Sequence, residues 1–565
     1  MSEPIEIYDT TLRDGAQQEG IALSIQDKLR IAALLDDLGV AVIEGGWPGA
    51  IPKDTEFFAR ALGTPEAPGE LKLKNAIFSA FGSTCKAGVS AEDDTQVKGL
   101  LDSGAPMITL VAKSDVRHVE KALKTDNAEN LRMVRDTVAY LVSQGRRVVL
   151  DAEHYFDGLA FDPQYGLEVL VEAGRAGAET VTLCDTNGGN LPSSIAEVVS
   201  KTRAHLDANG LGHVRVGIHC HNDTGCAVAN SIAAVEAGAV QVQGVVNGYG
   251  ERTGNADLLT CAANIQIKLK RPGLHVPPSY WQASPQEKAQ IQEGLNPQAG
   301  LAELSRYSNA IAEIVNISPG RRAAYVGASA FAHKAGLHAS AIRVDPDLYQ
   351  HIDPALVGND MRMLVSEMAG RASVELKARE MGIDFSHDPD LISVTVAAVK
   401  EREARGYTYD AADASFELLM RYCGKTLPIF YEVESWRASV QARADMTLTG
   451  ETEAEATVKI LIKDKRLVIT GEGNGPVNAL DHALRDALKG TYPHVEDFEL
   501  VDYKVRILDE DSGTESHVRV LITTTDGEKL WTTVGIGTDV IEASWEALSD
   551  SMTWGLMKAR AEALG

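Results

Sequence analysis

The sequence lacks the features that tie a chain to an oxidising compartment or to a membrane. Its six cysteines include no Cys-x-x-Cys pair and follow no zinc-ribbon or disulfide spacing. The first residues, MSEPIEIYDT, contain no basic segment followed by an apolar one, so we expect no signal peptide. No apolar run approaches the length of a membrane span. We therefore expect a cytoplasmic protein with reduced, buried cysteines.

Positive charge is also scarce. The 565 residues include 54 Lys and Arg against 80 Asp and Glu, which gives a formal net charge of −26. An acidic chain repels nucleic-acid phosphates and anionic lipids, so we expect neither nucleic-acid nor membrane partners. The length is too great for a single hydrophobic core, and we expect two or three domains.

Eight short apolar segments in the first half of the chain alternate with helical patterns, one of which runs from Ser24, a plausible N-cap, to Leu38. This alternation indicates a parallel sheet covered on both faces, and eight units predict a (β/α)8 TIM barrel at residues 1–275. A doubly wound open sheet is disfavoured because no strand is followed by a GxGxxG turn. The predicted strands are Ile5–Tyr8, Ala41–Gly45, Lys74–Ala80, Met107–Ala112, Arg147–Glu153, Thr180–Cys184, Val214–His219 and Gln241–Val246.

The remainder of the chain has two other patterns. Residues 276–430 are mainly helical and are predicted to form linker subdomains. Residues 431–565 contain a twofold β-β-β-α pseudo-repeat, in which Gly471-Glu472-Gly473 and Gly535-Ile536-Gly537 occupy equivalent places. Asp526-Gly527 is expected to form a hairpin turn. The pattern predicts a separate α+β domain that either binds a regulator or joins two subunits.

The motif His219-Cys220-His221 is the most informative in the chain. In a strand, residues i and i+2 point to the same side, so both imidazoles face one space. A carboxylate would complete a two-His, one-carboxylate metal site with open positions, and Asp14, just after the first strand, is the candidate. Two hydrogen-bonding histidines at a strand end are the alternative interpretation.

Other polar residues follow the predicted strand ends, where the active sites of TIM barrels lie. We therefore expect a site at this rim. A metal there could polarise the keto carbon of a 2-oxoacid, and Arg13 could neutralise the alkoxide that develops. The rim residues are Arg13, Asp14, Glu44, Glu153, Asp185, Thr186, His219, His221 and the segment Asn247 to Asn255.

Five of the candidate residues also have a structural interpretation. Arg13 could form an ion pair with a rim carboxylate, and Glu153 could orient the substrate, move a proton or only stabilise the fold. Thr186 could donate to a substrate carboxylate or cap a helix. Asn255 could bind the metal or serve a turn. His338, outside the barrel, could reach the site as an acid or base or be a satisfied histidine.

Four stretches carry a resemblance to known enzymes: DTTLRDGAQQEG, HCHNDTGCAVANS, NGYGERTGNADL and AGLHASAI. With these motifs the chain resembles the 2-isopropylmalate, homocitrate and citramalate synthases, a family of metal-dependent Claisen-condensing barrels. Within this family it most resembles the citramalate synthases of the long type, with support from YQHIDPALVGND and LVSEMAGRAS. The last domain resembles the regulatory domain of the family.

The resemblance implies a metal site. It implies Asp14, His219 and His221 as ligands of a divalent cation, with Asn255 near the metal. The ligand types suit Mg²⁺, Mn²⁺ and Zn²⁺ alike. A catalytically inactive regulatory protein is therefore disfavoured, since every expected ligand is present.

The resemblance also implies the groups that act on the substrates. It implies Arg13 as the group that stabilises the oxyanion and Thr186 as the group that holds the 2-oxoacid carboxylate. Glu153 matches the family's strand-five glutamate, although here His154 follows it where the commoner family pattern has an acid. His338 matches the acid/base histidine of the family, and Tyr349 is the candidate for the tyrosine that works with it.

The reaction implied by the resemblance joins acetyl-CoA to pyruvate and gives (R)-citramalate and CoA, in isoleucine biosynthesis. The resemblance further implies inhibition by isoleucine through residues 431–565, and two related halves suit a homodimer. Two alternatives remain: a 2-isopropylmalate synthase with 2-oxoisovalerate as acceptor, and a lyase of the 3-hydroxy-3-methylglutaryl-CoA lyase type. The long segment beyond the barrel favours a synthase over a lyase.

Overall fold

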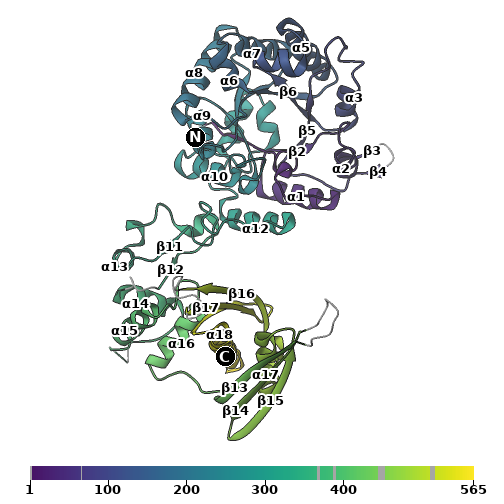
Figure 1. Cartoon of the computed structure of the whole chain (residues 1–565). Helices are drawn as coiled ribbons and strands as arrows, with labels where there is room; N and C mark the ends of the chain where they lie inside the picture. Colours follow the sequence, from purple (N-terminus) through teal and green to yellow (C-terminus); the bar gives the residue numbers. More distant parts are fainter. Residues whose placement is uncertain are drawn as a thin grey trace. The chain divides into compact units, whose positions relative to one another are not determined.

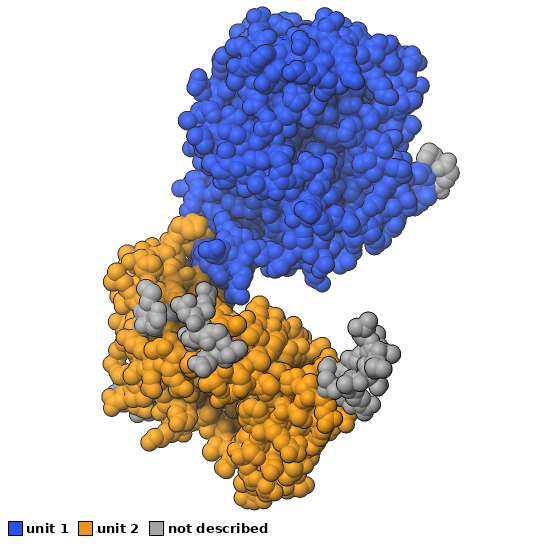
Figure 2. Space-filling view, viewed as in Figure 1, with its two compact units in different colours: residues 1–331, 353–360 blue, residues 332–352, 361–565 orange. Residues whose placement is uncertain are grey.

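The computed structural model describes residues 3–64, 67–365, 370–385, 388, 390–442, 452–508 and 516–564. The chain forms two compact units, residues 1–331 with 353–360 and residues 332–352 with 361–565 (Figure 2). Part of the LVSEMAGRAS stretch, residues 366–369, lies outside the described residues. The finer division at residues 275 and 430 stays a prediction. Among the described residues, no helix combines the length and apolar character needed to cross a bilayer.

The first unit contains a closed barrel of eight parallel strands, which confirms the predicted TIM barrel (Figure 1). Each strand lies within three residues of its predicted bounds at both ends. In order around the barrel the strands are β1 (Glu6–Asp9), β2 (Val42–Gly46), β5 (Ile77–Ser83), β6 (Met107–Lys113), β7 (Arg147–Glu153), β8 (Thr180–Asp185), β9 (Arg215–Cys220) and β10 (Gln241–Gly244).

Helices connect successive strands of the barrel. The first begins at Ile25, and Ser24 is its N-cap as predicted and forms a reciprocal capping box with Asp27. A short hairpin of β3 (Gly63–Thr64) and β4 (Ala67–Pro68), which was not predicted, lies outside the barrel. The helices are α1 (Ile25–Leu38), α2 (Pro52–Leu62), α3 (Thr95–Asp102), α4 (Val116–His118), α5 (Asn127–Ser143), α6 (Tyr155–Phe161), α7 (Tyr165–Ala176), α8 (Pro192–Ala208), α9 (Ala227–Glu236) and α10 (Leu258–Ala263), followed by α11 (Pro285–Glu293) and α12 (Leu304–Val315).

The second unit begins with short helices and ends in two three-stranded antiparallel sheets. Each sheet is followed by one helix, which confirms the β-β-β-α repeat. The helical part contains β11 (Ala332–His333), α13 (Gly336–Ile342), β12 (Arg362–Met363), α14 (Arg371–Glu380), α15 (Leu391–Ala404) and α16 (Asp413–Cys423). The first half-repeat contains β13 (Glu432–Ala442), β14 (Thr452–Ile462), β15 (Lys465–Gly473) and α17 (Pro476–Lys489), and the second β16 (Glu499–Ile507), β17 (Val518–Thr525), β18 (Leu530–Gly537) and α18 (Val540–Leu564).

The repeated glycines allow the third strand of each half to cross its helix closely. A Cβ at Gly471 would lie 2.5 Å from the backbone nitrogen of Ala483 in α17, and one at Gly535 would lie 2.0 Å from the carbonyl oxygen of Ala543 in α18. Buried side chains from both halves form one hydrophobic core. The predicted turn at Asp526-Gly527 joins β17 to β18, with Gly527 at a φ of +90°.

Candidate active site

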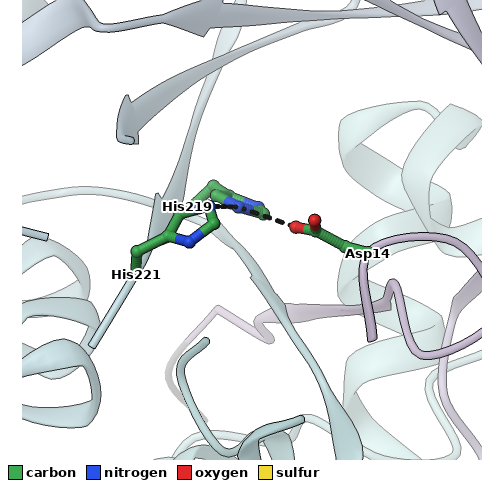
Figure 3. A group of neighbouring side chains, drawn as sticks. All are labelled: Asp14, His219 and His221. Atoms are coloured by element: carbon green, nitrogen blue, oxygen red, sulfur yellow. Dashed lines mark hydrogen bonds and ion pairs between the residues drawn. The ribbon is translucent and has the colours of Figure 1, made fainter. Parts of the chain in front are cut away.

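The two histidines of the motif lie side by side where β9 ends (Figure 3). Both are buried, and His221 forms an isolated β-bridge with Asn255. Asp14 approaches from the turn after β1, where the carbonyl oxygen of Thr10 accepts the backbone N–H groups of Arg13, Asp14 and Gly15. This tight turn aims the Asp14 carboxylate at the imidazoles.

The side chains of Asp14, His219 and His221 are close enough to share one cation. One potential ligand atom from each residue lies within 4.8 Å of the others. His219 Nε2 is 3.2 Å from Asp14 Oδ2 and 3.4 Å from His221 Nε2. Within the described part of the chain, this is the one such group of His, Cys, Asp and Glu side chains.

The surroundings of these three residues also fit a metal ion. Asn255 Nδ2 donates to Asp14 Oδ2 at 2.8 Å and lies 3.3 Å from His219 Nε2. His221 Nδ1 and Asn255 Oδ1 are buried and have no hydrogen-bond partner among the described residues. The two Nε2 atoms and the Asp14 carboxylate oxygen form a buried set of donor atoms that one cation could share. The nitrogen and oxygen donors suit Mg²⁺, Mn²⁺ or Zn²⁺.

The charges around the site favour the protonation states that metal binding requires of Asp14 and His221. For His219, burial lowers the pKa, but the contact with Asp14 outweighs it and raises this pKa. Burial raises the pKa of Asp14, but the charge of Arg13 and the contact with His219 outweigh it and hold this pKa well below its usual range. Burial, and next the charge of His219, lower the pKa of His221 to about 4. At neutral pH a carboxylate and a neutral imidazole therefore face the shared space.

Arg13 is held on two sides. Its Nε donates to Glu44 Oε1 at 2.6 Å, its Nη1 lies 3.2 Å from Asp14 Oδ1, and its guanidinium stacks on Phe81 at 3.9 Å from the ring centroid. Glu44 is fully buried and also accepts from the hydroxyl of Tyr8 at 2.8 Å. The ion pair with a rim carboxylate is thus present, and the guanidinium lines the cavity as well.

Six of the predicted site residues line one cavity of about 430 Å³: Arg13, Asp14, Glu153, Thr186, His219 and His221. Glu153 ends β7 and forms an ion pair with Lys113, the last residue of β6. The hydroxyl oxygen of Thr186 accepts the backbone N–H of His154 at 2.8 Å. The cavity beside the candidate metal ligands therefore offers a guanidinium, a carboxylate and a hydroxyl to a substrate.

His338 and Tyr349 lie in the second unit. His338 is part of α13, and its ring stacks on that of Tyr349 with the centroids 4.1 Å apart. The structure thus brings these two residues together, and their part in the reaction stays a prediction.

Glu251 and Arg252, from the predicted rim segment Asn247 to Asn255, also line the cavity. The sequence did not indicate several other residues that line it: Trp47, Phe81, Val111, Lys113 and Asp151. Lys113 could have been found, because it ends a strand like the other rim residues. Asp151 had no such signal, since it lies two residues before the end of β7 within an apolar run. Burial, and next the charge of Glu44, raise its pKa to about 6.

Comparison with known proteins relates the whole chain to one group of enzymes. Residues 4–279 match the family described as HMGL-like, residues 325–406 the homocitrate synthase post-HMGL domain-like family, and residues 410–555 the LeuA allosteric (dimerisation) domain. A protein of Streptomyces coelicolor named (R)-citramalate synthase is 55% identical over 99% of this chain and 98% of its own. One of Aquifex aeolicus with the same name is 44% identical over the full length of both. A 2-isopropylmalate synthase of a Synechococcus is 29% identical over 97% of this chain and 94% of its own.

Proposed function

The chain belongs to the (R)-citramalate synthase family, and from this premise we propose that it condenses acetyl-CoA, pyruvate and water to (R)-citramalate and free CoA. The observation that carries the proposal is the convergence of Asp14, His219 and His221 on a cavity that Arg13 also lines. This arrangement suits a 2-oxoacid, which offers a keto oxygen and a carboxylate to the site. A cytoplasmic location is part of the proposal, and the six unpaired thiols support it.

Different residues of the site bind the metal and stabilise the developing negative charge. Asp14, His219 and His221 would hold the divalent metal, with Asn255 beside it. When bound, the metal supplies Lewis acidity to the keto group of the 2-oxoacid. Arg13 directs its guanidinium at the keto oxygen, where negative charge develops as the new carbon–carbon bond forms.

The remaining polar groups of the site orient the acceptor and move protons. Thr186 Oγ1 already accepts the N–H of His154, so its own hydroxyl proton is available for the substrate carboxylate. Glu153, which lines the cavity beside Lys113, orients the substrate or moves a proton. We assign the remaining proton transfers to His338, with Tyr349 stacked on it.

Pyruvate is proposed over 2-oxoisovalerate on the strength of the relatives. The proteins named (R)-citramalate synthase share far more sequence with the chain than the one named 2-isopropylmalate synthase. The match of residues 410–555 to an allosteric (dimerisation) domain favours a regulated synthase over a lyase. The same match supports a homodimer as the proposed assembly.

Isoleucine is the proposed inhibitor, and a cavity of about 810 Å³ beside α17 offers a place for it. Asp481 lines this cavity and is 8% exposed, and its Oδ1 has no hydrogen-bond partner among the described residues. Such a carboxylate oxygen suits the ammonium group of an amino acid. Val477 and Leu500 also line the cavity and suit an aliphatic side chain.

Metal removal tests the proposed site. The chelated enzyme should release no CoA from acetyl-CoA in the presence of pyruvate, and Mg²⁺, Mn²⁺ or Zn²⁺ should restore the reaction. His219→Ala and Asp14→Ala should remain folded by circular dichroism but lose metal affinity and activity, since each removes one of three ligands. Full activity in the chelated enzyme or in either variant would refute the metal site.

A further inference from the structure

Gln243 contacts the candidate metal ligand His219 and has no part in the roles assigned above. It is fully buried in β10, and its register partner in the neighbouring strand β9 is His219. Its Oε1 lies 2.9 Å from His219 Nδ1. This contact is on the far side of the imidazole from Nε2, the atom that faces Asp14 and His221.

The orientation of the Gln243 amide is determined by its other neighbours. Its Nε2 lies 2.8 Å from Asp151 Oδ1. At neutral pH this buried carboxylate is mostly ionised and can only accept, so it requires the NH₂ end of the amide. Reversing the amide would place Gln243 Oε1 against the carboxylate and leave His219 Nδ1 facing a donor.

A second chain of hydrogen bonds requires the same orientation. Gln241 Nε2 donates to the buried Glu6 Oε2 at 2.7 Å, so Gln241 Oε1 accepts the hydroxyl proton of Thr182 at 3.0 Å. The hydroxyl oxygen of Thr182 can then accept from Gln243 Nε2, which lies 3.3 Å away. The carboxylates of Glu6 and Asp151 thus fix the orientation of the Gln243 amide.

We propose that Gln243 is a positioning residue for metal binding, which fixes the ring orientation and the tautomer of His219. Its carbonyl oxygen can only accept, so His219 donates its Nδ1–H to Gln243, and Nε2 is the nitrogen left to bind a cation. Nε2 faces Asp14 and His221, where a cation would bind. Hydrogen-bond partners of this kind orient histidine ligands and set their tautomer.

The amide between Asp151 and His219 orients the ring without placing a negative charge directly on it. Metal-binding histidines commonly donate their second N–H to a carboxylate, which raises ligand basicity. Here Asp14, Glu44 and Asp151 already lie buried at the site. Asp151 orients the neutral amide of Gln243, and this amide in turn orients His219 without adding a further charge.

The test compares Gln243→Met with Gln241→Met. Both residues are fully buried on the same face of β10, but Gln241 bonds to Glu6 and Thr182 instead of His219. The readouts are the Kd of the metal-free protein for Mn²⁺, by titration, and the melting temperature without metal. We expect Gln243→Met to raise the Kd by about 10- to 100-fold, and Gln241→Met to leave it within about three-fold at a comparable loss of melting temperature. An unchanged Kd in Gln243→Met, or an equal rise in Gln241→Met, would overturn the proposal.

A measurement on the wild-type protein covers the case in which Gln243→Met does not fold. In ¹⁵N-histidine-labelled protein loaded with Zn²⁺, with His219 assigned by loss of its signals in His219→Gln, we expect a protonated Nδ1 and a metal-bound Nε2. The opposite tautomer would contradict the proposal. The inference rests on the proposed metal site, but different results refute the two. Wild-type protein that binds no metal refutes the site. Tight binding by wild type together with an unchanged Kd in Gln243→Met refutes only the role of Gln243.

Discussion

At the scale of single residues, Arg13 offers the sharpest test of the chemistry. Arg13→Lys should stay folded but lose about 3–4 kcal/mol of transition-state stabilisation, the usual effect of removing one oxyanion donor. Lysine cannot donate to Glu44 through one edge while directing a planar fork at the substrate. The measurement is kcat for CoA release, with circular dichroism as the folding control. A near wild-type rate would reduce Arg13 to a structural ion pair.

Asp9 should make the stability of the barrel depend on pH. It is fully buried and accepts from Thr11 N and Oγ1, and burial raises its pKa to about 7. The folded state therefore binds more protons than the unfolded state between about pH 4 and pH 7. Across this range the unfolding free energy should fall as pH rises, by up to about 1.4 kcal/mol per pH unit.

Asp9→Asn removes this titration and tests the assignment. Thermal unfolding of wild type and variant at pH 5, 6, 7 and 8 should give a flatter pH profile for the variant between pH 5 and 7. Asp151 also has a raised pKa but is present in both proteins, so the difference between the profiles isolates Asp9. Parallel profiles would contradict the assigned pKa.

The sequence predicts the residues of the site that belong to a recognisable local pattern. The two histidines share a face because of their spacing, and Asp14 follows a strand, so both could be placed at the rim. Phe81 and Gln243 carry no such signal, because they follow from contacts between strands far apart in the sequence. Only the register of β9 against β10 shows that Gln243 faces His219.

At the scale of secondary structure, the sequence predicts best where packing imposes a period. All eight barrel strands are buried and continuous, so their positions were predicted within a few residues. The first strands of the two half-repeats, β13 and β16, were implied by the repeat but could not be located. Both are outer strands of their sheets with exposed apolar residues such as Val440 and Val505, so no clean alternation marks them.

Gly535 should be intolerant of any side chain. A Cβ there would lie 2.0 Å from the carbonyl oxygen of Ala543 and 2.8 Å from the backbone nitrogen of Ala547, and these backbone atoms cannot move aside as a flexible side chain could. We expect Gly535→Ala to destabilise the second unit by about 1–3 kcal/mol or more, as overpacking does. Gly490→Ala is the matched control, because Gly490 follows α17 with a φ of −68° and open space around it. Equal melting temperatures for the two variants would show that β18 and α18 do not pack this closely.

At the scale of the whole molecule, we assign metal and acceptor binding to the first unit, and regulation together with the proton transfers of His338 to the second. The sequence predicts a catalytic and a regulatory part because the strand–helix alternation of residues 1–275 differs from the β-β-β-α repeat of residues 431–565. It does not predict the observed division into units, because residues 332–352 and 353–360 join different units although they are adjacent in the chain. That division depends on packing between distant segments.

Asp481→Asn should weaken inhibition by isoleucine without changing the uninhibited rate. Loss of the carboxylate charge at the proposed ammonium site should raise the isoleucine concentration for half-inhibition by about 10-fold, a coupling loss of about 1.4 kcal/mol. Asp486→Asn is the control, because Asp486 lines the same cavity but is exposed and pairs with Lys489. Inhibition curves for isoleucine, leucine and valine provide the comparison. If the wild-type enzyme ignores all three, the second unit is better interpreted as a dimerisation module.

The most direct test of the account is the choice of acceptor by the metal-loaded wild-type enzyme. CoA release from acetyl-CoA is measured with pyruvate, 2-oxobutyrate and 2-oxoisovalerate, and the product from pyruvate is identified by chiral chromatography. We expect the highest kcat/KM for pyruvate and (R)-citramalate as its product, since one extra methylene that fits poorly changes selectivity by about 1–3 kcal/mol. A higher kcat/KM for 2-oxoisovalerate, or no CoA release with pyruvate, would contradict it.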